Sequence, residues 1–332
     1  MSSPLVDGFG RVHRSLRLSV TDRCNFRCPY CMPAGHVVFQ PRSEILSYEE
    51  FQTLVRVGTR LGIREVRITG GEPLVRRDLP RLVEKLSAIP WIEDLSLTTN
   101  GFYLRELAGP LREAGLHRIN ISLDTLREDR FKELSGVDGL DRVLDGIEAA
   151  RQAGFSPIKV NAVLLRGINE DEAEDLVDWA RRLNLSFRFI ELMPIGGGPV
   201  RGREHLVPGA EVKARIERRY RLVPDERCDP SSPARTFRFA DGSGEIGFIN
   251  PVTEPFCAHC DRLRITADGK IRNCLFDQGE LDLRGPLRSG ASEAELEAVW
   301  RRAVKNKGIG GCVELAEESD SGSTRRMWQI GG

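Results

Sequence analysis

Short runs of apolar, largely β-branched residues alternate with longer stretches of helical periodicity through the first part of the chain. An isolated apolar run favours a buried strand, whereas apolar residues recurring every three or four positions favour an amphipathic helix. Four of the intervening stretches carry such a helical stripe, at residues 51–58, 79–86, 140–147 and 173–180. Six apolar runs predict strands, at Leu16–Val20, Glu65–Thr69, Leu95–Thr99, Arg118–Leu123, Ile158–Leu165 and Phe187–Leu192.

This alternation predicts an α/β fold with a parallel sheet and right-handed crossovers. The pattern alone does not separate a doubly wound sheet from an incomplete barrel. After Met193 the alternation stops at a glycine-rich loop, and we expect two units, residues 1–195 and residues 196–332. In the second unit we expect helices near residues 209–219 and 292–305, and strands at Thr236–Phe239 and Glu245–Ile249.

A cysteine triad, C-x3-C-x2-C, follows the first predicted strand at Cys24, Cys28 and Cys31. Thiolates this close in sequence can converge on one metal centre. A four-iron cluster usually takes four cysteine ligands, so three would leave one iron open. An open position is what a catalytic metal site keeps. The alternative is a structural zinc ion with a fourth ligand such as His36, although structural zinc sites prefer paired C-x2-C spacings.

A second triad, C-x2-C-x13-C, lies at Cys257, Cys260 and Cys274. A zinc ribbon with His259 as fourth ligand is the rival interpretation. His259, however, lies inside the two-residue loop between Cys257 and Cys260, and such a tight loop rarely lets both ends and the middle bind one ion. We therefore expect a second four-iron cluster, again with an open iron.

Charge and composition bear on the partners, the compartment and the cysteine chemistry of the protein. Lys plus Arg and Asp plus Glu both number 49, so no global field favours nucleic acid or a membrane. The chain shows no apolar signal region at its N-terminus and no run of about 18 apolar residues, so we expect a cytoplasmic protein. In that reducing compartment the 8 cysteines favour metal ligation over disulfides.

Cations also interrupt four of the apolar strands. A buried, unpaired cation is costly, so each one needs an anion. Internal carboxylates such as Asp124 or Glu191 could supply it, but four cations on four strands that converge on one face indicate a strongly anionic small molecule. No Walker A loop is present to hold a nucleotide in the P-loop manner. The four cations are Arg17, Arg67, Lys159 and Arg188.

The first triad after a strand resembles the signature of the radical S-adenosylmethionine (SAM) enzymes. This resemblance implies a partial six-stranded βα barrel, in which the open iron binds the methionine part of SAM. Electron transfer from the cluster then cleaves SAM to a 5′-deoxyadenosyl radical. The Gly-Gly-Glu-Pro segment at the end of the second strand could be only a turn, but it also matches that family's motif for the SAM amino group. The SAM-binding positions implied are Tyr30, Gly70, Gly71, Glu72, Ser122 and Met193.

The two triads, the strand cations and a final Gly-Gly together resemble the GTP 3′,8-cyclase family of molybdenum cofactor biosynthesis, over nearly the whole chain. The resemblance implies conversion of GTP to 3′,8-cyclo-7,8-dihydro-GTP, with guanine on the second cluster. It also implies a catalytic role for Gly331 and Gly332. Asp261 departs from the family, where Asn is expected. The implied GTP contacts are Arg17, Arg67, Thr98, Lys159, Arg262, Leu263 and Arg264, with Arg188 as a helper.

The same resemblance implies an external electron donor, a homodimer and a functional link to the next enzyme, cyclic pyranopterin monophosphate synthase. From the balanced charge and the lack of a long apolar run, we expect no nucleic-acid or membrane partner. Two other interpretations remain open from sequence. One is a peptide-modifying radical SAM enzyme with an auxiliary cluster, which typically needs more C-terminal cysteines. The other is a non-catalytic, zinc-stabilised nucleotide-binding protein.

Overall fold

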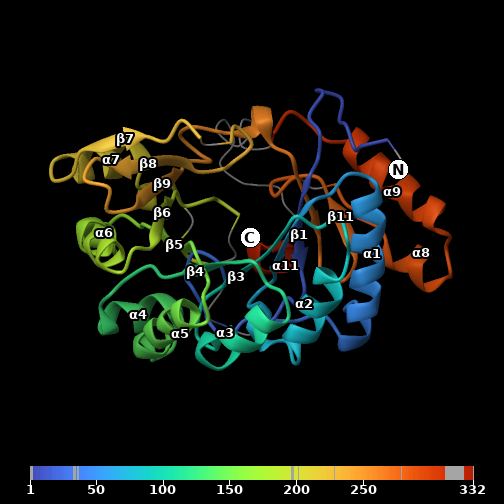
Figure 1. The fold of residues 1–332 in the computed structure, drawn as a ribbon, viewed down its shortest axis with the longest axis horizontal. Helices are drawn as coiled ribbons and strands as arrows, with labels where there is room; N and C mark the ends of the chain where they lie inside the picture. Colours follow the sequence, from blue (N-terminus) through green and yellow to red (C-terminus); the bar gives the residue numbers. More distant parts are fainter. Residues whose placement is uncertain are drawn as a thin grey trace.

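The computed structural model describes residues 3–32, 35, 37–195, 198–200, 202–227, 229–277, 279–310 and 325–331. These residues form one twelve-stranded sheet in the order β12-β11-β10-β1-β2-β3-β4-β5-β6-β9-β8-β7. The edge strands β12 and β7 do not pair with each other, so the curved sheet stays open (Figure 1). The expected α/β partial barrel is confirmed.

The six predicted strands form the central part of this sheet, and each pairs in parallel with its neighbour in sequence. Their bounds are β1 Ser15–Ser19, β2 Glu65–Thr69, β3 Asp94–Thr99, β4 Arg118–Ser122, β5 Ile158–Val163 and β6 Ser186–Ile190. The later strands are β7 Leu222–Pro224, β8 Arg235–Phe239, β9 Glu245–Ile249, β10 Arg262–Ile265, β11 Lys270–Arg272 and β12 Leu281–Asp282.

Helices cover the outer face of the barrel, and each predicted helical stripe lies in one of them (Figure 1). None of the helices in the described parts of the chain combines the length and the apolar character of a membrane span. The helices are α1 Tyr48–Arg60, α2 Leu79–Ser87, α3 Leu104–Glu113, α4 Glu128–Ser135, α5 Leu140–Gln152, α6 Ala173–Arg182, α7 Gly209–Glu217, α8 Arg284–Arg288, α9 Glu293–Lys305 and α11 Met327–Ile330.

The segment after residue 195 extends the barrel at both edges. β10 pairs in parallel with β1, and β9 pairs in parallel with β6. The boundary expected at residue 195 therefore falls in the loop after β6, and the residues beyond it continue the same sheet. The short helix α11 lies within the barrel, so the last described residues reach its interior (Figure 1).

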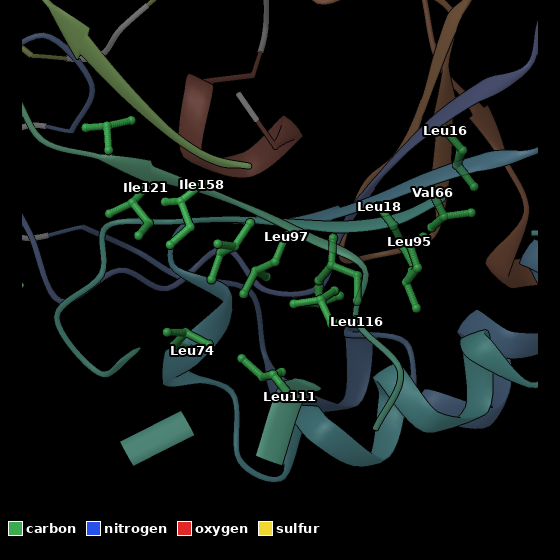
Figure 2. Close-up of a cluster of buried hydrophobic side chains, with 14 of the residues drawn as sticks. Leu16, Leu18, Val66, Leu74, Leu95, Leu97, Leu111, Leu116, Ile121 and Ile158 are labelled. Atoms are coloured by element: carbon green, nitrogen blue, oxygen red, sulfur yellow. The ribbon is translucent and has the colours of Figure 1, made fainter. Parts of the chain in front are cut away.

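The main core lies between the sheet and the surrounding helices. Leu18, Val66 and Leu97 on successive strands are fully buried, and Figure 2 shows them directed toward the helical layer. Burying one such side chain contributes about 1.5–3 kcal/mol to folding. Because successive side chains of a strand point to opposite faces, Arg17 and Arg67 lie on the other face, toward the barrel interior.

Candidate active site

A cavity of about 330 Å³ lies inside the barrel. Most of the residues predicted for the site line it, which brings both cysteine triads to one space. The lining cysteines are Cys24, Cys28, Cys31, Cys257, Cys260 and Cys274. The other predicted residues that line it are Arg17, Tyr30, Arg67, Gly70, Gly71, Glu72, Thr98, Ser122, Arg188, Met193, Arg262 and Arg264.

The first triad lies in the loop after β1, and burial raises the pKa of its thiols. The pKa of Cys24 and of Cys31 is raised to about 12. Burial also raises the pKa of Cys28, and the nearby Asp124, Cys31 and Cys24 raise it further. Three thiols that repel one another's charge in a desolvated pocket fit a cationic cluster, which binds them as thiolates.

The loop that carries the first triad is held against the end of β2. A Cβ on Gly71 would lie 2.3 Å from the carbonyl oxygen of Arg23, and one on Gly70 would lie 2.7 Å from that of Thr21. The amide of Gly71 donates to the Thr21 carbonyl at 2.7 Å. The two glycines therefore permit close approach of backbone to the cysteine loop, a packing role that adds to any contact with a ligand.

Glu72 is buried at the cavity wall and accepts several hydrogen bonds. Its donors are the Thr99 hydroxyl at 2.7 Å, the Asn100 amide at 2.6 Å and the Leu74 amide at 2.9 Å. Burial nevertheless raises its pKa to about 7. A cation bound beside Glu72 would restore the ionised form.

Tyr30 and Asp124 form a second buried polar pair beside the first triad. The Tyr30 hydroxyl donates to a carboxylate oxygen of Asp124 at 2.5 Å, and the Val163 amide donates to the other oxygen at 2.8 Å. Burial raises the pKa of Asp124 to about 6. Asp124 is thus occupied by Tyr30 and does not serve as the counter-ion of the strand cations.

The second triad has a more electropositive surrounding than the first. The Lys307 ammonium lies 3.6 Å from the Cys260 sulfur and donates to the Arg262 carbonyl at 2.7 Å. The Arg262 guanidinium lies 3.2 Å from the same sulfur. Burial raises the pKa of Cys260, but the charges of Arg262 and Lys307 outweigh it, and the pKa is lowered overall. This surrounding stabilises a thiolate.

Single-metal sites gain no support from the geometry. The described residues contain no group of three or more His, Cys, Asp or Glu side chains that could hold a metal ion. A zinc ion needs its ligands to converge on one point, whereas each cysteine of a cubane cluster binds a different iron. His36, the possible fourth zinc ligand of the first triad, lies outside the described residues.

Three arginines lie side by side across the barrel wall. Arg264 pairs in register with Arg17, and Arg17 pairs with Arg67. Burial lowers the pKa of Arg17, and the charges of Arg67 and Arg264 lower it further. Burial likewise lowers the pKa of Arg67 and of Arg264 to about 10. Like charges directly opposite on neighbouring strands are destabilising, so this row requires an anion.

The anion does not come from the described part of the protein. No described carboxylate lies within ion-pair distance of the three arginines in the row, of Arg262 or of Lys159, as the ion pairs among described residues show. Glu191, the other internal candidate, accepts from the amides of Gly209 and Val252 at 3.0 Å each. Ion pairing among the described residues therefore does not account for Arg17, Arg67 and Lys159.

Lys159 lies on β5 beside this positive region. Burial lowers its pKa to about 7, and the charges of Arg188, Arg118 and Arg67 contribute to the shift. Lys159 is only partly buried and is not among the residues that line the cavity. It is placed to receive a proton when an anion enters.

The C-terminal segment enters the cavity. Met327 and Trp328 of α11 line it, and the Arg264 guanidinium donates to the Gly331 carbonyl. Gly331 has a φ of 70°, and a Cβ there would lie 2.6 Å from the Cγ2 of Thr69. Only glycine fits this position. Gly332 lies outside the described residues.

Sequence comparison decides the family. Residues 18–180 match the Radical SAM superfamily, and residues 185–310 match the Molybdenum Cofactor Synthesis C family. A GTP 3′,8-cyclase of Moorella thermoacetica is 48% identical over 98% of this chain and 99% of that protein. The chain belongs to the GTP 3′,8-cyclase family. A second member, from Rhodopirellula baltica, is 49% identical over 91% of this chain and 86% of that protein. A third, from Streptomyces coelicolor, is 44% identical over 99% of this chain and 96% of that protein.

Solved structures share the fold of this family member. Streptococcus suis SuiB bound to the precursor peptide SuiA superposes with a TM-score of 0.64 and 15% identity, over 93% of this chain and 68% of that chain. SuiB bound to S-adenosylmethionine gives a TM-score of 0.61, also at 15% identity, over 95% of this chain and 77% of that chain. At this identity the likeness concerns the fold alone. Membership of the radical SAM superfamily implies one four-iron cluster and bound SAM, and the first triad and its surroundings fit both.

Neither Leu263, an expected GTP contact, nor Asp261, the departure from the family pattern, lines the cavity. Leu263 is fully buried in the main core and does not line the cavity, so its side chain faces away from Arg262 and Arg264. Asp261 is not a lining residue either, and no ion pair joins it to Arg262 among the described residues. The extra negative charge therefore does not face the cavity.

Several site residues escaped the sequence analysis. Lys307 reaches Cys260 from the loop after α9. Arg11 donates to the Cys257 carbonyl at 2.8 Å from the N-terminal segment. Buried polar atoms also line the cavity without a described partner, the Oδ1 atoms of Asn161 and Asn273 and the Nε1 of Trp328. No motif signals Lys307 or Arg11, because each acts through a contact distant in sequence.

Proposed function

We propose that this protein converts GTP to 3′,8-cyclo-7,8-dihydro-GTP, the first step of molybdenum cofactor biosynthesis, with SAM and two four-iron clusters. The observation that carries this proposal is the row of Arg264, Arg17 and Arg67, which lies in one cavity with both cysteine triads. The relatives that match nearly the whole chain are GTP 3′,8-cyclases.

At the first triad, Cys24, Cys28 and Cys31 would hold the SAM-binding cluster. Glu72, whose ionised form needs a cation, suits the amino group of SAM, and Gly70 and Gly71 present backbone beside it. Tyr30, Ser122 and Met193 would complete the SAM site around the adenosine. When bound, the cluster and SAM supply the 5′-deoxyadenosyl radical that removes the ribose 3′ hydrogen.

At the second triad, Cys257, Cys260 and Cys274 would hold a second cluster with one iron open for guanine. The nearby charges of Arg262 and Lys307 support the thiolates there. The arginine row and Lys159 would bind the triphosphate, with Arg188 and Thr98 beside it. These residues bind and orient GTP so that the ribose 3′ carbon faces C8 of guanine. Positioning is thus the main contribution of the protein.

The proposal includes partners that the enzyme needs in the cell. A radical SAM cluster must be reduced, so an external electron donor acts on it. The cyclised nucleotide would pass to cyclic pyranopterin monophosphate synthase, the next enzyme of the pathway. We also propose that the protein acts as a homodimer. Sedimentation of the anaerobically purified protein tests the last point directly.

Anaerobic turnover tests the function. Protein reconstituted with iron and sulfide is incubated with SAM, dithionite and GTP, and the products are separated by liquid chromatography with mass detection. We expect 5′-deoxyadenosine and the cyclised nucleotide in equal amounts. SAM cleavage without any nucleotide product, under conditions in which a known GTP 3′,8-cyclase is active, would contradict the proposal. ATP in place of GTP is the matched control and should yield no cyclised nucleotide.

A further inference from the structure

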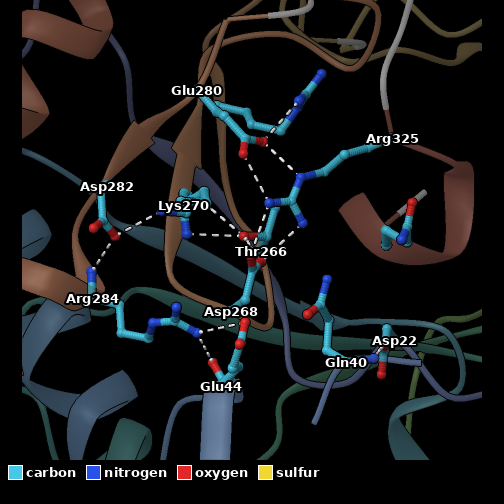
Figure 3. Close-up of polar contacts among 12 residues, drawn as sticks. Asp22, Gln40, Glu44, Thr266, Asp268, Lys270, Glu280, Asp282, Arg284 and Arg325 are labelled. Atoms are coloured by element: carbon cyan, nitrogen blue, oxygen red, sulfur yellow. Dashed lines mark hydrogen bonds and ion pairs between the residues drawn. The ribbon is translucent and has the colours of Figure 1, made fainter. Parts of the chain in front are cut away.

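A four-contact ion-pair cluster fixes the point where the C-terminal segment approaches the barrel. Arg325 donates to both carboxylate oxygens of Glu280, at 2.7 and 2.8 Å. It also donates to both oxygens of Asp268, at 3.0 and 2.8 Å (Figure 3). The side chains of Arg325 and Asp268 are 14% and 8% exposed. Bidentate pairs of this kind are among the strongest hydrogen bonds in proteins, and they fix geometry as well.

The two carboxylates lie beside strands at one edge of the sheet and are themselves held by hydrogen bonds. Asp268 follows β10 and accepts from the Thr266 hydroxyl at 2.6 Å. Glu280 precedes β12 and accepts from the fully buried Arg272 at 3.2 Å. β10 also bears Arg264, the residue that donates to the Gly331 carbonyl. One end of the segment is therefore attached to the turn after β10 and to the start of β12, and the other end to β10 itself.

Apart from this cluster, the segment is held by a few apolar side chains and by the hydrogen bond from Arg264 to Gly331. The helix α11 has 4 residues, far too few for a stable isolated helix. Its buried side chains are Trp328 and Ile330, and Ile330 joins Ile195 and Leu275 in a small cluster separate from the main core, against which Met327 packs. A terminal glycine pair loses much backbone entropy when it is ordered. The ion-pair cluster is thus the principal polar attachment among the described contacts of residues 325–331.

We propose that Arg325 is a positioning residue for catalysis, which docks the C-terminal segment through Asp268 and Glu280 so that Gly331 reaches the cavity. This inference rests on the proposed function, because the segment matters only if the reaction takes place in that cavity. Arg325 touches no predicted substrate or cofactor position. It acts through the placement of the residues that follow it.

The test compares Arg325→Ala with Arg326→Ala, whose exposed side chain forms no ion pair among the described residues. Both proteins are reconstituted anaerobically as full chains. We expect Arg325→Ala to lower the kcat for nucleotide cyclisation by at least about tenfold, because the loss of even one charge-assisted contact corresponds to about ten- to a hundredfold. The KM for SAM, the iron content and the melting temperature should match wild type. Arg326→Ala should behave as wild type throughout.

Hydrogen exchange of the C-terminal peptide gives a readout that is independent of turnover. In Arg325→Ala the amides of residues 327–331 should exchange at least tenfold faster than in wild type, while β10 and β11 keep their protection. Arg325→Lys should recover part of the protection and part of kcat, because a lysine restores the charge without the bidentate geometry.

The outcomes separate this inference from the proposed function. If wild type makes no cyclised nucleotide, the proposed function fails, while the exchange measurement still tests docking. Unchanged exchange and unchanged kcat in Arg325→Ala would overturn the positioning role. So would a loss of iron or of β10 protection, since that would show a general structural role. If Arg325→Ala does not fold, Glu280→Gln removes one half of the attachment and should give an intermediate loss.

Discussion

The guanidinium of Arg264 donates a hydrogen bond to the carbonyl oxygen of Gly331, so the end of the chain and the arginine row meet inside the barrel. Arg264 is buried, with 7% of its surface exposed, and it pairs in register with Arg17. The same side chain is thus placed to hold the C-terminal segment and to bind the triphosphate. This relationship would link the proposed catalytic tail to the proposed substrate site.

Replacement of Arg264 by Ala should weaken the binding of GTP by about ten- to a hundredfold. A charge-assisted hydrogen bond contributes roughly 1.5–3 kcal/mol, and about 1.4 kcal/mol is tenfold in affinity. Guanosine, which has no phosphates, should bind almost as in wild type, and the iron content should not change. Anaerobic equilibrium dialysis of both ligands measures this. Equal losses for GTP and guanosine would mean that Arg264 supports the loop or the tail and does not read phosphate.

Replacement of Gly331 by Ala should abolish most nucleotide cyclisation without affecting folding. The added Cβ would lie 2.6 Å from Thr69 Cγ2, and the φ of 70° disfavours a side chain. Deletion of the last two glycines should have the same effect. Gly308→Ala is a matched control, because no atom lies within 4 Å of its added Cβ. Melting temperature, iron content and product are the measurements, and normal product formation by Gly331→Ala would refute the catalytic role of the tail.

Each cysteine triad should account for half of the bound iron. Wild type should hold about eight irons per chain after reconstitution, because two four-iron clusters are expected. Replacing Cys24, Cys28 and Cys31 by Ala should halve the iron and abolish SAM cleavage. Replacing Cys257, Cys260 and Cys274 should also halve the iron but leave slow, uncoupled SAM cleavage. Wild-type protein with about four irons per chain would eliminate the second cluster.

Binding of GTP at pH 8 should take up a proton through Lys159. With a pKa of about 7, this lysine is mostly neutral at that pH in the free protein. A triphosphate raises the pKa of a nearby ammonium group, so binding adds a proton and the affinity falls as the pH rises from 7 to 9. Calorimetry in two buffers of different ionisation enthalpy gives the proton count. Lys159→Met should remove the uptake; a count of zero in wild type would show that the lysine is already charged.

Much of the barrel was predictable because its signals are local. From the alternation of apolar strands with helical stripes, the bounds of the six central strands were predicted to within one or two residues. For Glu65–Thr69 the predicted and observed bounds are the same. The cations stood out because Arg17 and Arg67 interrupt otherwise apolar runs. The cysteine spacings likewise depend only on neighbours in sequence. Signals of this kind need no knowledge of tertiary structure.

The remaining parts depend on contacts distant in sequence. Nothing in Arg262–Ile265 indicates that this short strand pairs in parallel with β1, or that β9 pairs with β6. Lys307 and Arg325 find their partners through packing that no short motif encodes. The sequence predicted a ligand-binding role for Gly70 and Gly71. The structure shows in addition that both glycines lie close to the backbone of the cysteine loop. Long-range pairing is the information that a pattern of neighbours lacks.

The most direct test of the proposed reaction uses GTP that carries deuterium at the ribose 3′ position. Reconstituted protein is incubated anaerobically with this substrate, SAM and dithionite, and the mass of 5′-deoxyadenosine is measured. We predict that it gains one deuterium, in proportion to the cyclised nucleotide formed. Unlabelled 5′-deoxyadenosine together with a cyclised product would contradict abstraction at that carbon, and labelled 5′-deoxyadenosine without such a product would contradict the cyclisation itself.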